Sequence, residues 1–168
     1  MPESAAGLYE EDFARWSQEQ SAALREAAKL GTNLPLDWEN LAEEVESLGR
    51  SQRHELRSRI AVIVEHLLKL QCSPAADPRR SWMETVGQQR SEIELVIGDS
   101  PSLKGEVGGM VAEETSRMAR HVIGALRRYG EATPEVFSEI SSARYTADQV
   151  LGDWFPGDAP LPANGERE

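Results

Sequence analysis

The sequence predicts an all-α protein, a helical bundle built on two long helices at about residues 38–71 and 101–129. Three observations predict this fold. Apolar residues recur at helical spacing along most of the chain, and no stretch shows the period-two alternation of a strand. Residues that cap or break helices separate these stretches by short linkers. Helices joined by short loops are typical of bundles.

The size and charge of the chain predict one soluble domain. Its 168 residues are enough for a single hydrophobic core, which we expect over residues 1–156. Residues 157–168, rich in Pro, Gly and charge, are expected to form a disordered tail. With 18 basic and 29 acidic residues, the net charge is −11. Such a chain repels phosphate backbones and anionic lipids, so we expect neither nucleic acid nor membrane as a partner.

Two further absences predict a cytoplasmic protein. The sequence shows no secretory signal and no apolar run of the roughly 20 residues that a membrane span needs. Its one cysteine, Cys72, cannot form an intrachain disulfide and is expected to be structural.

The first two helices are predicted from their ends. Helical spacing of apolar residues covers residues 9–30, and Gly31 follows as a C-cap. Asp37 is expected to be the N-cap of the helix over residues 38–71. Gly49 is expected to bend this helix without breaking it.

The second helix carries the clearest apolar stripe. At 100° per residue, eight positions gather on one side of the helix axis and are predicted to be core: Leu41, Val45, Leu48, Leu56, Ile60, Ile63, Leu67 and Leu70.

The next two helices are predicted from serine and proline. Ser81 is expected to cap a helix that ends at Gly98. Ser100 and Pro101 then suit the N-cap and first positions of the long helix over residues 101–129.

The end of the chain follows the same rules. Thr133 and Pro134 open a short helix, and Thr146 caps a last helical turn. Trp154 and Phe155 are expected to dock on the bundle.

Polar side chains interrupt the apolar faces of both long helices. On the second helix they lie on or beside the stripe: Gln52, Glu55, Arg59 and His66. On the helix at 101–129, Glu114 and His121 fall at the centre of the apolar face, with Arg117 at its edge. If the two helices pack together, Glu55, His66, Glu114 and His121 could converge inside the bundle.

Two interpretations of this polar set remain open. Carboxylate and imidazole groups on facing helices can hold a metal ion or handle protons, with Glu55, His66, Glu114 and His121 as the ligands. The alternative is a set of half-buried polar residues neutralised by Arg59 or Arg117. We favour the second, because the chain lacks the Glu-x-x-His and H-E-x-x-H motifs. No metal or cofactor is predicted.

A second face of the helix at 101–129 consists of small residues: Gly105, Gly109, Ala112 and Ser116, with Gly108 and Ala119 beside them. Small side chains let another backbone approach closely. Either this helix is central in its own bundle, or the face mediates self-association as a homodimer.

Six blocks, in this order and spacing, resemble a known family: YEEDFARW, LDWENLAEEVESLGRS, HLLKLQ, RRSW, SPSLK and YTADQVLGDWFP. The chain resembles the bacterial family called domain of unknown function twenty-nine from Tyr9 to Pro156. The resemblance implies a helical, soluble bacterial protein and carries over no catalytic role. The family blocks include positions that match His66 and Trp82. The chain departs from the family pattern at Leu70 and in the glycine-rich start of its fourth helix.

No motif for nucleotide binding or hydrolysis is present. We therefore expect a non-enzymatic interaction or regulatory protein that binds an unknown protein partner or a second copy of itself. The alternative is a metal-dependent, hydrolytic enzyme that uses the inward Glu/His set. A third candidate is a small-molecule binder with a cleft at Trp16, Trp38 or Trp82.

Overall fold

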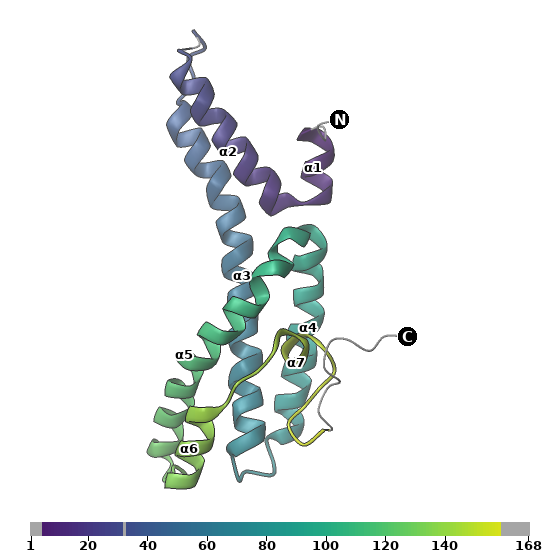
Figure 1. Cartoon of the computed structure of the whole chain (residues 1–168), viewed down its shortest axis with the longest axis vertical. Helices are drawn as coiled ribbons and strands as arrows, with labels where there is room; N and C mark the ends of the chain where they lie inside the picture. Colours follow the sequence, from purple (N-terminus) through teal and green to yellow (C-terminus); the bar gives the residue numbers. More distant parts are fainter. Residues whose placement is uncertain (1–4, 32, 159–168) are drawn as a thin grey trace. The chain divides into compact units, whose positions relative to one another are not determined.

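The computed structural model describes residues 5–31 and 33–158. Within these ranges it contains seven α-helices, one 3₁₀ helix and no strand (Figure 1). The prediction of an all-α protein is confirmed. The chain divides into two compact units, one of residues 1–56 with 94–106 and one of residues 57–93 with 107–168. None of the described helices combines the length and the apolar character that a membrane-spanning segment needs.

The predicted domain limits are not tested by this division. The single domain over residues 1–156 stays a prediction. The predicted tail, residues 157–168, lies outside the described residues from position 159 onward.

The first unit begins with α1 (Ala5–Glu11) and α2 (Phe13–Lys29). The prediction of one helix over residues 9–30 is wrong at Asp12, where the chain turns between the two helices. The Asp12 backbone is extended, with φ −156° and ψ 91°, and its Oδ1 accepts a hydrogen bond from the Arg15 amide at 3.0 Å. Asp12 is therefore the N-cap of α2.

Asp12 also holds a helix start that is far away in sequence. The Ser102 amide, in the 3₁₀ helix η1 (Pro101–Glu106), donates to Asp12 Oδ2 at 2.8 Å. In the other direction, the fully buried Ser100 hydroxyl accepts a hydrogen bond from the Ala14 amide at 3.1 Å. Ser100 thus serves the start of α2, whereas the sequence predicted it as the N-cap of its own helix. The two helix starts exchange caps because the fold brings them together.

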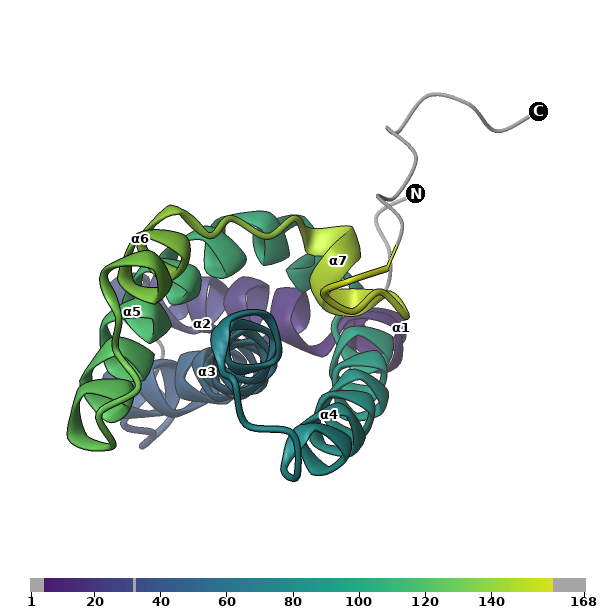
Figure 2. The same cartoon turned by 90° about the horizontal axis from the view of Figure 1, so that it is seen from below.

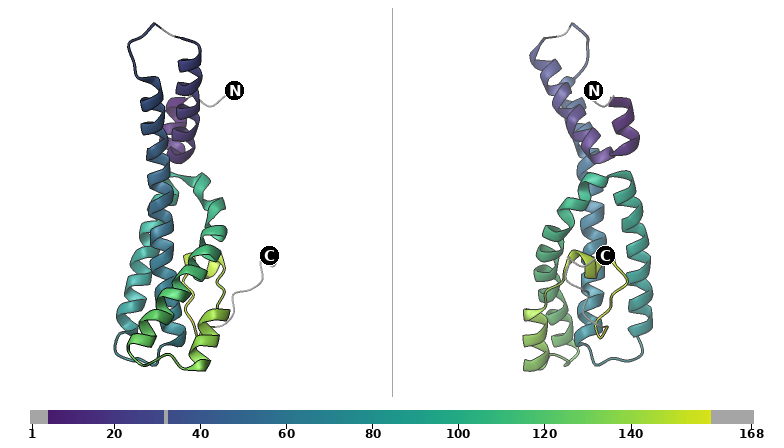
Figure 3. Two further views of the ribbon diagram at one scale, coloured as in Figure 1. Left: turned by 90° about the vertical axis from the view of Figure 1, so that its left-hand side faces the viewer. Right: turned by 45° about the vertical axis from the view of Figure 1, so that its right-hand side comes forward.

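In this unit α3 (Trp38–Cys72) runs antiparallel to α2 (Figures 1 and 3). The two helices approach closely at Gly49. A Cβ on Gly49 would lie 2.1 Å from Ser17 Oγ and 3.3 Å from the Ala14 carbonyl oxygen. The prediction that α3 continues through Gly49 is confirmed, and the close approach of α2 explains why a residue without a side chain occupies this position.

This close packing displaces part of the predicted core stripe. Ala42 is fully buried and Gly49 is buried, whereas Leu41 and Leu48 are 40% and 45% exposed. The prediction that Leu41 and Leu48 belong to the core is wrong, because α3 here buries its small residues. The later part of the stripe is confirmed, since the following residues are buried: Leu56, Ile60, Ile63, Leu67 and Leu70.

The second unit is arranged around the C-terminal half of α3. Figures 1 and 2 show α4 (Arg79–Asp99) on one side of it, and α5 (Val107–Arg128) with α6 (Pro134–Ser142) on the other. The core between these helices is aliphatic and includes side chains without exposed area: Ile60, Ile63, Val64, Leu67, Leu68, Val86, Ile140 and Val150.

The helix predicted over residues 101–129 is present in two pieces, η1 and α5. Its predicted apolar face is buried at Leu103, Val107, Met110, Met118 and Val122. Helix α3 has 35 residues, whereas α4 and α5 have 21 and 22. The prediction of two long helices is therefore fully met by the first and only in part by the second.

Several predicted helix ends are confirmed. Gly31 and Gly130 follow α2 and α5 with positive φ angles of 66° and 72°. The Thr133 hydroxyl accepts from the Val136 amide at the start of α6. The Asp37 carboxylate accepts from the Asn40 amide at 3.2 Å. Ser81 is not a cap, because α4 already begins at Arg79.

Arg90 holds the end of the described chain on α4. Its guanidinium donates to three backbone carbonyl oxygens, those of Val150, Gln149 and Trp154, at 3.0, 2.9 and 2.7 Å. It also lies over the Phe155 ring, 4.8 Å from the ring centre. The predicted docking of Trp154 and Phe155 is confirmed by these contacts.

Arg90 is 7% exposed, although it carries a charge. Burial lowers the pKa of Arg90, and the charge of Asp153 opposes this shift. Just before the held segment, α7 (Ala147–Leu151) is closed by a capping box between Thr146 and Gln149, which confirms the predicted cap.

Candidate interaction groove

The small-residue face of α5 is open. Gly109, Ala112 and Ser116 are all exposed, and a Cβ on Gly109 would meet no described atom within 4 Å. The interpretation that the rest of the bundle covers this face is therefore wrong at these positions. Gly105, the fourth predicted member, lies in η1 of the first unit and is also exposed.

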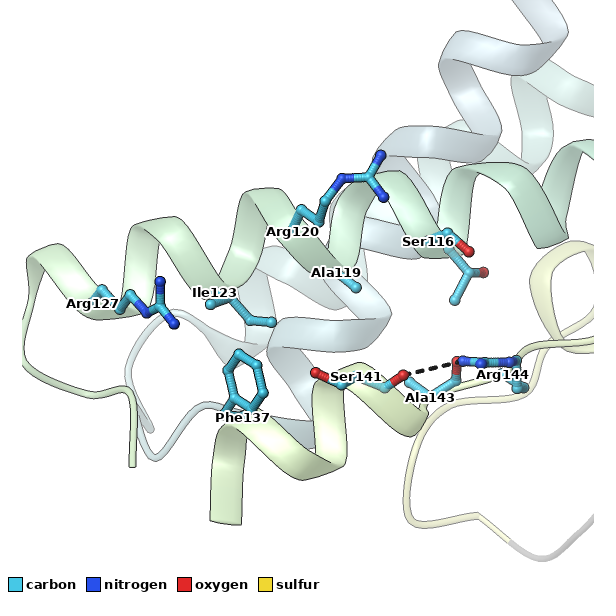
Figure 4. A pocket seen from close by; sticks show the side chains of 10 residues that line it. Ser116, Ala119, Arg120, Ile123, Arg127, Phe137, Ser141, Ala143 and Arg144 are labelled. Carbon is cyan, nitrogen blue, oxygen red and sulfur yellow. Dashed lines mark hydrogen bonds between the residues drawn. The ribbon is translucent and has the colours of Figure 1, made fainter. Parts of the chain in front are cut away.

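Further along the same side of α5, α6 covers the helix and leaves a groove of about 410 Å³. Its lining continues the stripe from Ser116 to Ala119 and Ile123 at helical spacing. Figure 4 shows Ile123 of α5 opposite Phe137 of α6. The groove is lined by Thr115, Ser116, Ala119, Arg120, Ile123, Arg127, Phe137, Ser141, Ala143 and Arg144.

Three of these lining residues are arginines, and none is an acid. The Cζ of Arg127 lies 5.7 Å from the centre of the Phe137 ring. The Nη1 of Arg144 donates to the Ala143 carbonyl oxygen at 2.6 Å. Figure 4 shows Arg127 and Arg144 toward opposite ends of the groove, with Arg120 on α5 between them.

Within the described part of the chain, Arg120, Arg127 and Arg144 pair with no carboxylate. This is unusual for the molecule, because most of its other arginines form ion pairs and its net charge is −11. The groove is thus a positive and partly apolar region on an acidic protein.

Glu114, one of the predicted inward residues, is 3% exposed. Its Oε2 accepts a hydrogen bond from Arg117 Nε at 2.6 Å, and its Oε1 lies 3.6 Å from Arg57 Nη1. The buried carboxylate is therefore neutralised by two guanidinium groups. This arrangement agrees with the favoured interpretation, in which Arg117 neutralises the inward acid.

The two predicted histidines lie near Glu65, which the sequence analysis did not single out. The Nε2 of His121 is 3.9 Å from Glu65 Oε1, while the Nδ1 of His66 is 2.8 Å from the Val62 carbonyl oxygen. His66 is half-buried, but the His121 side chain is 57% exposed. Its predicted central position on the buried face is wrong, because a helix drifts by about 20° per heptad and carries His121 from Glu114 to the rim.

Arg59 and Glu55 lie elsewhere. Arg59 links α3 to α4, with its Nη1 3.3 Å from Gln89 Oε1 and its Nη2 3.5 Å from Glu92 Oε2. Glu55 is half-buried and belongs to the first unit. Among the described residues, no three His, Cys, Asp or Glu side chains are grouped so that they could hold a metal ion. No observation supports the metal-dependent enzyme.

The electrostatic surroundings of Glu65 make its role testable. Burial raises the pKa of Glu65, but the hydrogen bond from Lys69 and the charges of Lys69, His121 and His66 outweigh it, so the net pKa is lowered. A carboxyl with a lowered folded-state pKa stabilises the fold above its unfolded pKa, and this stabilisation is lost as the pH falls through the folded pKa.

Glu65→Gln is accordingly expected to lower the free energy of unfolding at pH 7 by about 1 kcal/mol. Below about pH 4 the loss should shrink, because the native carboxyl is then becoming protonated too. Urea unfolding at both pH values measures this difference. Glu84→Gln, at an exposed pair with Arg80, is the matched control and should change little. An equal loss for Glu65→Gln at both pH values would contradict the expectation.

The single cysteine is buried and chemically quiet. Burial, together with the nearby Glu139 carboxylate, raises the pKa of Cys72 to about 12. Burial also raises the pKa of Tyr145, with smaller contributions from Cys72 and Glu139. Because the thiolate is the reactive form, Cys72 fits the predicted structural role.

The groove arginines were missed by the sequence analysis, although α5 carries a signal for two of them. Residues 115–130 contain four arginines and one histidine but no acid. Arg120 and Arg127 are seven residues apart and therefore share a side of the helix. Phe137 and Arg144 reach the groove from α6 and the residues after it, and no local pattern predicts that.

A family model matches residues 8–155 of the chain and is described as Domain of unknown function DUF29. The chain belongs to the DUF29 family. The match covers residues of both units and confirms the resemblance seen in the six sequence blocks. The DUF29 description assigns no activity.

A solved structure is similar to this DUF29 protein. It is the crystal structure of an alpha-helical protein of unknown function from Rhodospirillum rubrum, with a TM-score of 0.63 and 23% sequence identity. The similarity covers 88% of this chain and 98% of that one, and it supports the all-α fold. No curated protein matches the chain.

Proposed function

We propose that this DUF29 protein is a non-enzymatic interaction module that binds an acidic helix of a partner protein along α5. The observation that carries the proposal is the groove between α5 and α6, which combines three arginines that lack a carboxylate partner with exposed apolar side chains. The proposal requires neither a metal nor a cofactor. A cytoplasmic location is part of it, since a lone, buried cysteine suits a reducing compartment.

The shape of this surface favours a helix as the ligand. From Gly109 to Arg127 the stripe on α5 extends over about 27 Å at 1.5 Å per residue, which is the length of five helical turns. Its first half, at Gly109, Ala112 and Ser116, has no bulky side chain and allows a close backbone approach. Its second half offers the Phe137 ring, which is 44% exposed. Exposed aromatic rings beside arginines are common at the centres of protein interfaces.

The charge of this surface favours an acidic ligand. Arg120, Arg127 and Arg144 can each donate two hydrogen bonds to a carboxylate. A partner helix that carries leucine or phenylalanine on one side and glutamate beside it would satisfy both the groove and its rim. The remaining surface of the molecule, with its excess of acids, would repel the same helix outside the groove.

Binding of a fluorescein-labelled synthetic helix of glutamate, leucine and phenylalanine tests the proposal by fluorescence anisotropy. Arg120→Glu combined with Arg127→Glu is expected to raise the Kd at least about tenfold, a loss of about 1.4 kcal/mol. Ser116→Trp should also block binding, since its ring would fill the close-approach stripe. Arg128→Glu is the matched control, because Arg128 is exposed on the same helix but does not line the groove.

Equal weakening by Arg128→Glu and by the groove variants would reduce the effect to net charge and overturn the proposal. Inorganic phosphate as a competitor separates a helix from a small anion, because only a small-anion site should be emptied by it at constant ionic strength. Light scattering at micromolar concentration tests the second copy as occupant. A dimer that Ser116→Trp dissociates would replace the separate partner with self-association.

A further inference from the structure

The first unit contains a pocket that is independent of the groove on α5. It has a volume of about 280 Å³ and is lined by Tyr9, Glu10, Phe13, Gln52 and Asp99. These residues come from α1, α2, α3 and the end of α4, all within this unit. The lining combines two carboxylates, two aromatic rings and one amide, and it contains no base.

Gln52 is the unusual member of the lining. Its Oε1 is shielded from solvent, yet it accepts no hydrogen bond in the described structure. A buried carbonyl oxygen without a donor costs free energy, and native proteins rarely leave one unsatisfied. Gln52 is also one of the polar residues that interrupt the apolar stripe of α3. The pocket therefore offers an acceptor that a bound N–H or O–H group would satisfy.

The two carboxylates make the pocket negative. Glu10 and Asp99 are exposed, and neither takes part in an ion pair among the described residues. Asp99 is the last residue of α4, where the partial negative charge of the helix terminus adds to that of the side chain. Both features favour a cation and disfavour an anion.

The aromatic residues can add a favourable surface for a cation. Tyr9 packs edge-on against Phe13 and Trp16, with ring centres 5.6 and 4.8 Å apart. Tyr9 is 47% exposed, so part of its ring is free to contact a ligand. The face of an aromatic ring attracts ammonium and guanidinium groups.

We propose that this pocket binds the primary ammonium or guanidinium group of a small organic amine. The N–H donors of such a group would satisfy Gln52, its charge would pair with Glu10 and Asp99, and its alkyl part would contact Tyr9 and Phe13. A quaternary ammonium carries the same charge but has no N–H for Gln52. A neutral alcohol has a donor but no charge.

Nuclear magnetic resonance of the whole chain, labelled with ¹⁵N, tests the proposal through the side-chain amide of Gln52. We expect n-butylammonium chloride to shift this resonance in a saturable way, with tetramethylammonium chloride and n-butanol at least about tenfold weaker. Butylguanidinium chloride should bind as well as n-butylammonium. The side chain of acetyl-lysine amide is a further probe. Similar affinity for it would assign the source of the cation to a protein side chain, and weaker affinity to a free amine.

Gln52→Leu separates the ligand from a merely structural role. It should weaken n-butylammonium binding at least about tenfold and raise the melting temperature of the free protein, because it removes an unsatisfied buried oxygen. For this variant the backbone amides of Tyr9 and Phe13 report binding. Gln88→Leu, at an exposed position of α4, is the matched control and should leave binding unchanged.

Asp99→Asn should weaken binding without changing the melting temperature. The proposal is overturned if Gln52→Leu binds n-butylammonium as tightly as the unchanged protein. Equal affinity for tetramethylammonium, or no saturable shift at millimolar amine, would overturn it as well.

Discussion

Replacement of Arg90 with leucine is expected to lower the free energy of unfolding by about 3 kcal/mol or more. Arg90 is buried and donates to three carbonyl oxygens of the C-terminal segment, those of Gln149, Val150 and Trp154. Leucine fills part of the volume but donates no hydrogen bond, so these oxygens lose their partner at once. We expect the segment from Thr146 to Phe155 to detach before the rest of the second unit unfolds.

Urea unfolding combined with limited proteolysis checks this expectation. Arg90→Leu should expose the chain near Tyr145 to a protease that leaves the unchanged protein intact. Arg90→Lys should fall between the two, because an ammonium group cannot span the same three carbonyl oxygens. Arg80→Leu, where the arginine is 90% exposed on the same helix, is the matched control and should cost less than about 0.5 kcal/mol. If Arg80→Leu costs as much as Arg90→Leu, the anchor assigned to Arg90 is wrong.

Replacement of Gly49 with valine is expected to destabilise the first unit by about 2–3 kcal/mol. Its Cβ would lie 2.1 Å from Ser17 Oγ and 3.3 Å from the Ala14 carbonyl oxygen, so α2 would have to move away from α3. Gly49→Ala should have a smaller effect, because the cost of the contact is partly offset by about 1 kcal/mol of helix propensity.

A second substitution identifies the contact as the cause. Ser17→Ala removes the oxygen nearest to the new Cβ, so the pair Ser17→Ala with Gly49→Ala should recover most of the stability that Gly49→Ala loses. Gly98→Ala is the matched control in the same unit, since nothing lies within 4 Å of its added Cβ, and it should be neutral or stabilising. Thermal unfolding of the four variants measures these differences. Additive costs in the double variant would contradict the proposed contact.

Local chemistry explains which predictions succeeded. The caps at Asp37, Thr133 and Thr146 act on amides only three residues ahead, so the residue type and its position are enough to predict them. Gly31 and Gly130 end helices through their own backbone angles. The aliphatic stripe from Leu56 onward is buried as predicted, because several helices surround α3 in the second unit.

The wrong predictions concern positions where a neighbouring element decides. Leu41 and Leu48 fall on the apolar side of the wheel, but α3 meets α2 through Ala42 and Gly49 in the first unit. Ser100 looks like a local N-cap, and its hydroxyl instead serves Ala14, which is 86 residues away. Nothing within a window of the sequence specifies which helix will lie opposite.

Arg90 and the groove show the same division at the level of the sites. Arg90 shares the predicted apolar side of α4 with Val86 and Ile93, so its burial could have been suspected. Its partners are carbonyl oxygens, which every residue carries, and no sequence pattern distinguishes them. Arg144 and Phe137 likewise meet Arg120 and Arg127 only after α6 folds back on α5.

The sequence by itself therefore determined the helical class, the family, most helix ends and the aliphatic core of the second unit, because these depend on residue types at short and regular spacing. The tertiary structure alone decided that α2 and α3 pack through small residues, that Glu114 lies between Arg57 and Arg117, and that three arginines surround one groove. These features depend on which helix faces which. That choice minimises the free energy of the whole chain and leaves no mark on a single turn.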